Sequence, residues 1–181
     1  VGNASTNWQD EIFRSAPTQD HSITVSGGNE RTKFFTSLGY SDQLGIIKNS
    51  GYDRFSARLN LENIISDELS FGMNLGYTRS NTQQVQNDNN IYGALGASIL
   101  IPPVVPIFND DGSYGGAFGI ENAVAAVTEY QNNIIRGKLL GNVYGKWNIT
   151  EELSFRASLG VDIINSNERI YEPRVLQSSN T

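Results

Sequence analysis

The stretch that decides the fold is Leu69-Ser70-Phe71-Gly72-Met73-Asn74-Leu75-Gly76-Tyr77. Its odd positions are large and apolar, and its even positions are small or polar. Because successive side chains of a strand point to opposite faces, this alternation predicts a strand with one apolar face. The same alternation predicts five further strands, located near residues 22–26, 33–40, 55–61, 139–149 and 153–163.

The links between these strands alternate in length. Residues 27–31, 66–68 and 150–152 form short, turn-rich or acidic links, whereas the link from about Asn81 to Asn133 is very long. Such a long loop argues against a compact soluble domain. Short turns that alternate with long loops are typical of outer-membrane barrels.

Composition excludes several classes of function. The 181 residues include no cysteine and one histidine, His21, so disulfides, thiol chemistry and Cys-based zinc sites are excluded. Lys and Arg number 13 against 19 Asp and Glu, a net charge of -6 that argues against a nucleic-acid partner. Apolar runs such as Ile99-Leu100-Ile101 are far shorter than the roughly 20 residues of a membrane helix, whereas a barrel strand needs only about 9 to 11.

The expected fold is therefore all-β, a fragment of an antiparallel transmembrane β-barrel with about six strands and one long extracellular loop. An open sheet edge in lipid leaves backbone groups unpaired, so the sheet is expected to close on strands beyond this chain. The chain lacks a start methionine, and both ends are interpreted as cuts in a longer protein. The residues expected to face lipid are Phe55, Leu59, Leu61, Leu69, Phe71, Met73, Leu75, Tyr77, Val143, Trp147, Leu153, Phe155, Leu159 and Val161.

The opposite face of the predicted strands carries charged and amide side chains. It is expected to line the lumen, where these groups can bond to one another and to water. The lumen candidates are Arg58, Glu62, Asn74, Asn142, Lys146, Arg156 and Asp162.

Several segments, in this order and spacing, resemble SusC/RagA-type, TonB-linked outer-membrane transporters. They are Asn7-Trp8-Gln9-Asp10-Glu11-Ile12-Phe13-Arg14, residues 26–35, residues 45–50, residues 54–61, and a proline-rich loop with Pro102-Pro103, Pro106 and residues 109–114. The resemblance implies a barrel of about 22 strands around a plug, in the outer membrane of a Gram-negative bacterium. It also implies import of oligosaccharides or peptides, driven by the TonB complex, with a SusD-type surface lipoprotein as a lid.

The same resemblance suggests a division of the chain along its length. Residues 1–19 would follow the plug, 20–80 would form four strands, 81–133 the extracellular loop, and 134–172 the last two strands. The plug and the TonB box are absent from the sequence. Outer-membrane lipid, the lipoprotein, the TonB complex and the substrate are the expected partners.

Candidate contact residues for substrate or lipoprotein lie in the long loop. They are Tyr92, Asn109, Asp110, Asp111, Tyr114 and Phe118, with Tyr130 a weaker aromatic candidate. Asp110-Asp111-Gly112 could begin a calcium loop, but the EF-hand pattern is not completed and a turn is favoured. No cofactor or metal is therefore expected. Residues 92–101 predict a short helix that stops at Pro102-Pro103.

Catalysis is not expected, because the paired carboxylates fall in predicted turns and loops and form no convergent acid and base set. The alternative function is a soluble or surface-anchored β-sandwich that binds glycans, since strands with one apolar face also build sandwich cores. A sandwich would not predict a link as long as residues 81–133.

Overall fold

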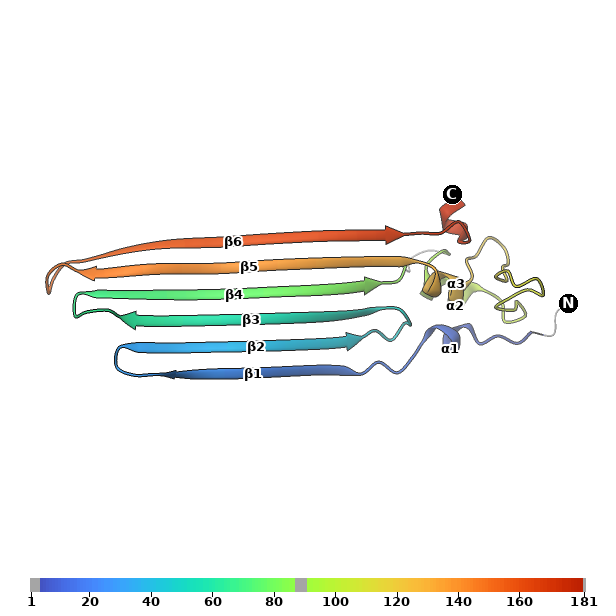
Figure 1. The fold of residues 1–181 in the computed structure, drawn as a ribbon. Helices are drawn as coiled ribbons and strands as arrows, with labels where there is room; N and C mark the ends of the chain where they lie inside the picture. The colour runs from blue at the N-terminus through green and yellow to red at the C-terminus, as the bar shows by residue number, and fades with distance from the viewer. Residues whose placement is uncertain (1–3, 87–90, 181) are drawn as a thin grey trace.

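Six strands form one antiparallel meander, in which each strand pairs with the next along the chain (Figure 1). The computed structural model describes residues 4–86 and 91–180. The strands are β1 (Thr18–Gly28), β2 (Thr32–Leu44), β3 (Gly51–Ile64), β4 (Leu69–Gln84), β5 (Gln131–Asn148) and β6 (Ser154–Tyr171). The register is continuous between each pair of neighbours. The fragment of an antiparallel barrel predicted from the sequence is confirmed.

The strands extend beyond the apolar alternation. β4 continues to Gln84 and β5 begins at Gln131, so the long connection covers residues 85–130. Ladder hydrogen bonds join backbone groups and require no apolar side chain, so amide-rich residues continue the pairing. Of the predicted loop 81–133, residues 87–90 lie outside the described residues, as do residues 1–3 of the predicted post-plug segment.

The three short turns lie together at one end of the sheet (Figure 1). Two of them share a design, because Ser66 and Thr150 each accept hydrogen bonds on Oγ or Oγ1 from the backbone N–H groups two and three residues ahead. In the first turn, the Asn29 side chain accepts from the N–H groups of Arg31 and Thr32. Such side-chain to backbone bonds stabilise tight turns.

At the other end of the sheet lies a region that we call the cap, made of residues 4–14, 45–50, 85–86, 91–130 and 172–180. It contains α1 (Trp8–Ile12), α2 (Ala94–Leu100), α3 (Ala123–Thr128) and the 3-10 helix η1 (Gln177–Asn180). α2 begins within the predicted helix 92–101 and ends just before Pro102. Among the described residues, no helix is long and apolar enough to cross a membrane.

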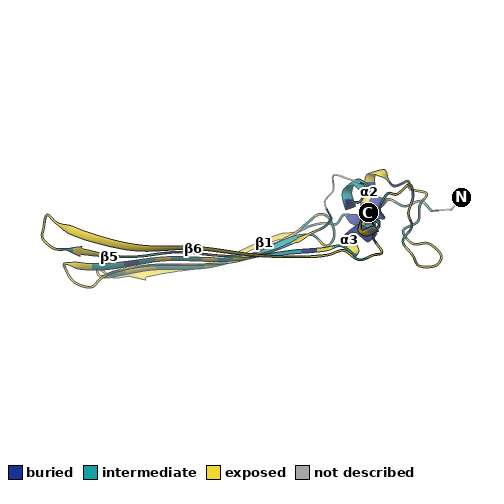
Figure 2. Ribbon diagram, turned by 90° about the horizontal axis from the view of Figure 1, so that it is seen from above, coloured by how far each residue is buried: buried dark blue, intermediate teal, exposed yellow. Residues whose placement is uncertain are grey.

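The cap and the sheet differ in how far their residues are buried (Figure 2). Every buried hydrophobic side chain of the described residues lies in the cap, and the strands leave large apolar side chains partly or largely exposed. All described strands belong to one sheet, so no second sheet covers the apolar face. The β-sandwich alternative, which requires two stacked sheets, is therefore wrong for the described part of the chain.

Candidate functional site

The register places the apolar alternation of neighbouring strands on a single face. Leu59 pairs with Leu75, and Met73 pairs with Val143, which pairs in turn with Leu159. Directly paired residues project to the same side of a sheet, so the apolar side chains form one continuous surface, here called the apolar face. All predicted lipid-facing residues within the strands lie on it, and Leu153 lies just before β6.

β1 and β2 continue this surface, since Ile23 pairs with Leu38 and Leu38 with Ala57. Toward the cap the surface ends in aromatic residues, where Tyr40 pairs with Phe55. Beyond them the same face becomes polar, with Asp53 opposite Asn81. The apolar face is therefore a band whose length on β4 matches the about 9 to 11 residues of a membrane-spanning strand.

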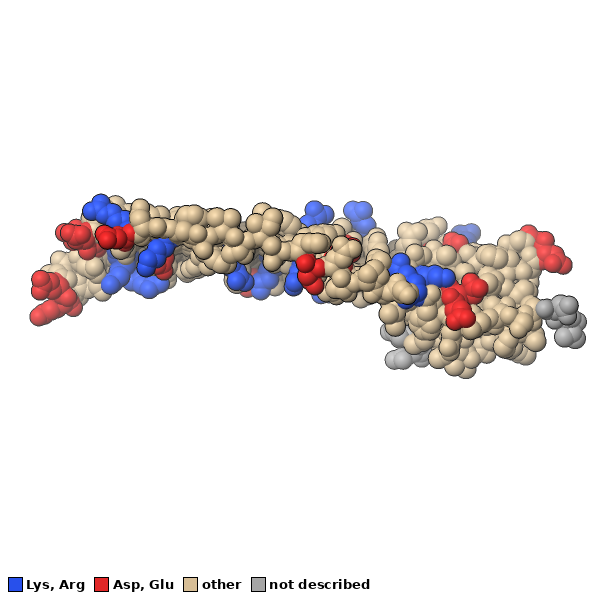
Figure 3. Space-filling model, turned by 90° about the horizontal axis from the view of Figure 1, so that it is seen from below, with Lys and Arg blue, Asp and Glu red and all other residues tan. Residues whose placement is uncertain are grey.

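On the opposite side of the sheet, here called the polar face, polar and charged side chains contact one another. Tyr144 lies against Gly72, Arg156 lies 4.0 Å from the centre of the Tyr144 ring, and the Tyr144 hydroxyl lies 3.5 Å from Glu62 Oε1. Lys138 and Asp162 form an ion pair at 3.6 Å. The predicted lumen residues all lie on this face. Figure 3 shows Lys and Arg along the sheet, and acidic side chains gathered at the turn end and again near the cap.

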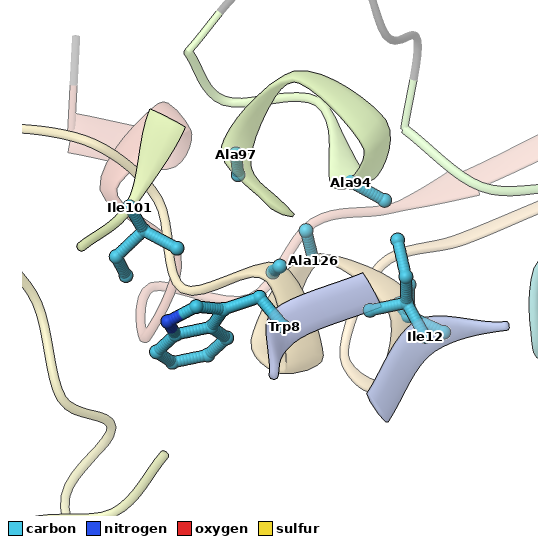
Figure 4. Close-up of a cluster of buried hydrophobic side chains, with 8 residues drawn as sticks. Trp8, Ile12, Ala94, Ala97, Ile101 and Ala126 are labelled. Carbon is cyan, nitrogen blue, oxygen red and sulfur yellow. The ribbon is translucent and has the colours of Figure 1, made fainter. Parts of the chain in front are cut away.

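The cap has its own small hydrophobic core (Figure 4). Trp8 and Ile12 from α1 pack on α2 and α3 through Ala94, Ala97 and Ala126, whose small side chains permit close approach. The indole N–H of Trp8 donates to the Pro102 carbonyl at 3.3 Å. The segment before the sheet and the long loop therefore fold into one unit.

Asn122 joins three parts of this unit. Its side-chain N–H groups donate to the carbonyls of Ile107 and Gly115, at 2.9 and 2.8 Å. Its side-chain oxygen caps α3 by accepting from the N–H groups of Val124 and Ala125. Because Asn122 is buried and all four bonds are made, it ties the proline-rich arm to α3.

The predicted loop candidates are only partly brought together. Asn109, Asp111 and Tyr114 belong to one tight turn, in which Ser113 donates its hydroxyl and its N–H to Asp111. These bonds lower the pKa of Asp111. Asp110 is exposed in the same turn. The observed turn uses Asp111 for an internal bond, as the turn interpretation expects.

Three aromatic candidates have different surroundings. The Tyr114 hydroxyl donates to Glu129 at 2.8 Å, and its ring lies 5.1 Å from that of Phe108. Phe118 is 88% exposed, and Tyr92 is half-buried. Tyr114 thus holds the turn against α3, and Phe118 projects from the cap.

A polar cavity of about 250 Å³ lies where the cap meets the ends of β4 and β5. Its lining residues are Asn49, Gln83, Gln84, Thr128, Tyr130, Gln131, Asn132 and Asn133. We call it the amide cavity. The sheet register sets Gln83 opposite Asn133 and Gln84 opposite Asn132. Asn49 reaches it from the β2–β3 link, where its side-chain N–H donates to the Val127 carbonyl at 2.9 Å.

Two residues of the lining have buried side-chain oxygens without a hydrogen-bond partner among the described residues. Asn132 is 9% exposed and donates its side-chain N–H to Glu168 Oε1 at 3.0 Å. No donor among the described residues reaches the buried side-chain oxygens of Asn132 and Asn133. Burial first, and then the nearby Glu172 carboxylate, raise the pKa of Tyr130.

Comparisons with known proteins agree on one type of receptor. No protein-family model matches the chain. It is 31% identical to the TonB-dependent receptor SusC of Bacteroides thetaiotaomicron, over 73% of this chain and 13% of that protein. A TonB-dependent receptor of Formosa agariphila is 29% identical over 91% of this chain and 16% of its own length. The solved RagAB peptide transporter has a TM-score of 0.72 and 23% identity, over 92% of this chain and 20% of its own, and shows the same fold.

The chain belongs to the SusC/RagA-type TonB-dependent receptors. It spans less than a fifth of the length of the curated relatives that it matches. Two segments that carry the resemblance meet in the cap of this SusC/RagA-type receptor. Arg14 donates from Nε and Nη2 to the carbonyls of Gly45 and Ser50, at 3.0 and 2.8 Å, and Phe13 forms a bridge with Ile47.

The amide cavity of this receptor was not among the sites predicted from sequence. A signal was present, because the runs Gln83-Gln84 and Gln131-Asn132-Asn133 flank the long loop. Tyr130, the weakest aromatic candidate by sequence, is the one aromatic residue in the lining. Recognising the cavity would have required the register that sets these two runs side by side.

Proposed function

We propose that this chain forms part of the wall and outer mouth of a TonB-dependent importer, which carries oligosaccharides or peptides across the outer membrane of a Gram-negative bacterium. The observation that carries the proposal is the apolar face, a continuous band that nothing in the described residues covers. Exposing such an apolar surface to water is unfavourable, whereas contact with lipid is not. The relatives named as TonB-dependent receptors support transport and not catalysis.

The two faces of the wall have separate roles in this proposal. The apolar face contacts lipid, with Phe55 and two tyrosines, Tyr40 and Tyr77, toward the head groups, where the apolar ring and polar hydroxyl of tyrosine are favourable. The polar face lines a hydrated lumen, and its Tyr144, Arg156 and Glu62 cluster offers hydrogen bonds to a plug. Coupling to the TonB complex would run through a plug and a TonB box, neither of which lies in these 181 residues.

The cap would face the cell exterior, where it meets the substrate and a SusD-type surface lipoprotein. Its surface bears exposed apolar side chains, namely Ile99, Leu100, Val104, Phe108 and Phe118. Exposed apolar side chains of this kind are candidates for contacts with a partner protein. The predicted loop residues Tyr92, Asn109, Asp110, Asp111, Tyr114 and Phe118 stay candidates for these contacts.

Cysteine labelling in the source cells tests the topology. Phe118→Cys in the cap and Asp67→Cys in a short turn are placed singly in the full-length receptor, in a background without other cysteines. A membrane-impermeant maleimide should label position 118 on intact cells, and position 67 only after permeabilisation. Labelling of position 67 alone on intact cells, or recovery of the receptor in the soluble fraction, would contradict the proposal.

Growth of a receptor deletion strain tests import. We expect growth to fail on at least one oligosaccharide or peptide offered as sole nutrient, and to return with the full-length receptor. An uncoupler of the proton gradient should abolish uptake of that nutrient. Unchanged growth on every member of a broad panel would count against an importer.

A further inference from the structure

Phe118 carries an inference that rests on the proposed function and concerns its partner protein. It lies with Gly119 at the tip of a tight turn, which the N–H of Ile120 closes by donating to the Ala117 carbonyl at 3.0 Å. Phe118 is 88% exposed, the highest value among the exposed large hydrophobic residues of the described part of the chain. We propose that Phe118 is an anchor that inserts into an apolar pocket of a partner protein at the cell surface.

The backbone of Phe118 is strained. Both central residues of the turn have positive φ, 59° for Phe118 and 72° for Gly119. Glycine adopts such angles freely, whereas a bulky side chain disfavours them, and turns of this kind usually have Asn, Asp or Gly at both positions. Because the ring is also exposed, it gains no burial within the chain that offsets the strain. A contact outside the chain would account for a phenylalanine at this position.

The base of the turn holds Phe118 in place. On one side, the Gly115 carbonyl accepts a hydrogen bond from the buried Asn122 side chain at 2.8 Å. On the other side, the Ile120 carbonyl accepts from the Gln177 side chain at 3.3 Å. A group that is already held in its bound conformation loses less conformational entropy on binding. Phe118 is thus exposed on a fixed support, as an anchor residue requires.

The position of Phe118 favours a partner protein over a small solute. Sites for small solutes are concave. Phe118 lines neither the amide cavity nor the cavities beside α1 and along the sheet. An aromatic side chain that projects from a surface is enclosed only when the partner supplies the pocket, which is how aromatic hot-spot residues bind in protein interfaces.

The charge of the cap predicts the surroundings of that pocket. The described residues of the cap include seven Asp or Glu and three Lys or Arg, and Asp110 is exposed in the neighbouring turn. Complementary charges across an interface accelerate encounter and fix orientation. We therefore expect Lys or Arg side chains around the apolar pocket. In the proposed function, the protein that bears it is the SusD-type surface lipoprotein.

Photo-crosslinking from position 118 tests the contact. Benzoylphenylalanine is placed at position 118 of the full-length receptor in the source cells, and at position 67 of a control. Light should join position 118 to one surface lipoprotein, at residues of an apolar pocket with Lys or Arg beside it, and position 67 should not reach that protein. The proposal is overturned when position 118 forms no crosslink, or joins only lipid, the receptor itself or many unrelated proteins.

Binding of that lipoprotein to the purified full-length receptor separates an anchor from a structural residue. Phe118→Ala and Phe118→Gly should each weaken binding about tenfold or more, as for a hot-spot aromatic residue. Phe118→Gly should also slow hydrogen exchange of residues 115–120 by about two- to fivefold, because glycine relieves the strain. Ile46→Ala, at an exposed apolar position of the cap outside the long loop, is the control and should leave binding unchanged.

Two results with Phe118→Gly would overturn the proposal. Unchanged binding would show that the ring is no anchor. Faster hydrogen exchange would show that the ring stabilises the turn, which gives it a structural role instead.

Docking to the purified receptor needs no TonB complex, so this result is separate from the import test. Loss of import in a receptor that still docks through Phe118 would count against the transporter and leave the anchor standing. Import that continues while position 118 makes no contact would remove the anchor and leave the transporter standing. The Phe118→Cys variant of the topology test lacks the ring, so position 118 should stay accessible to the maleimide.

Discussion

At the scale of single residues, Gly72 and Tyr144 pack against each other on the polar face. A Cβ atom at position 72 would lie 2.2 Å from Tyr144 Cζ, so only glycine leaves room for the ring. The seated ring in turn packs against Arg156. The nearby Gly76 has no such constraint, since its nearest neighbour would be the Leu140 carbonyl oxygen at 3.9 Å.

We therefore predict that Gly72→Ala destabilises the full-length receptor by about 1 to 3 kcal/mol, because overpacking displaces the ring. Thermal unfolding in detergent, followed by the heat shift on gels, measures the loss. Gly76→Ala is the control and should be nearly neutral. Adding Tyr144→Ala to Gly72→Ala should recover most of the loss, and a purely additive double variant would contradict the packing explanation.

We expect Tyr114 to make the turn at residues 109–114 sensitive to alkaline pH. Burial, and then its contact with Glu129, raise the pKa of Tyr114 above the ordinary value of 10.0. A group whose folded pKa is raised stabilises the fold fully below its unfolded pKa, and the contribution is lost as pH rises through the folded pKa. The bond to Glu129 is thus intact at neutral pH.

Hydrogen exchange of residues 108–115, corrected for the intrinsic effect of pH, should accelerate only above about pH 10. Tyr114→Phe should exchange faster at neutral pH and lose the alkaline step. An alkaline step of equal size in Tyr114→Phe would show that another group is responsible.

At the scale of elements, the short α1 helix owes its structure to the cap. A helix of 5 residues is too short to be stable alone in water. Its Trp8 and Ile12, four positions apart, project to one side and pack on α2 and α3. Since Arg14 also binds the β2–β3 link, α1 fastens the loop to the sheet.

Trp8→Ala should consequently open the cap and leave the sheet paired. Removing a buried tryptophan destabilises a core by about 3 to 5 kcal/mol. Since Trp8 is the largest side chain of this small cluster, its loss should separate α1 from α2 and α3. Limited proteolysis of the receptor in membranes should cut within residues 91–130 much faster than in the wild type. Gln9→Ala, an exposed neighbour in the same helix, is the control and should cut at the original rate.

At the scale of the whole molecule, the wall is one sheet with two unlike faces. Leu75 lies near the middle of the apolar band on β4, and Asn74 lies beside it on the polar face. An arginine in the lipid-facing middle of a barrel strand costs about 2 to 4 kcal/mol, whereas a lumen position tolerates it.

Leu75→Arg should accordingly lower the stability and the membrane yield of the full-length receptor, and Asn74→Arg should change both little. Heat-shift gels on isolated outer membranes measure both quantities. Equal effects of the two substitutions would mean that the apolar face does not contact lipid.

Much of the six-stranded sheet could be predicted from residues that are near one another in the sequence. The alternation from Leu69 to Tyr77 predicted the strand and its apolar face, and the repeated turns after Ile65 and Ile149 bounded the hairpins. The polar ends of β4 and β5, from Arg79 to Gln84 and from Gln131 to Lys138, carry no such alternation. Their pairing became visible only in the sheet.

The sequence by itself determined the strand period, the two faces and the alternation of short and long links, because these follow from backbone geometry and from the character of adjacent side chains. The tertiary structure alone decided the cap and the amide cavity. Their contacts join residues far apart in the chain, such as Trp8 with Pro102 and Asn49 with Val127. Such contacts depend on how the loop returns over the sheet, which no local pattern encodes.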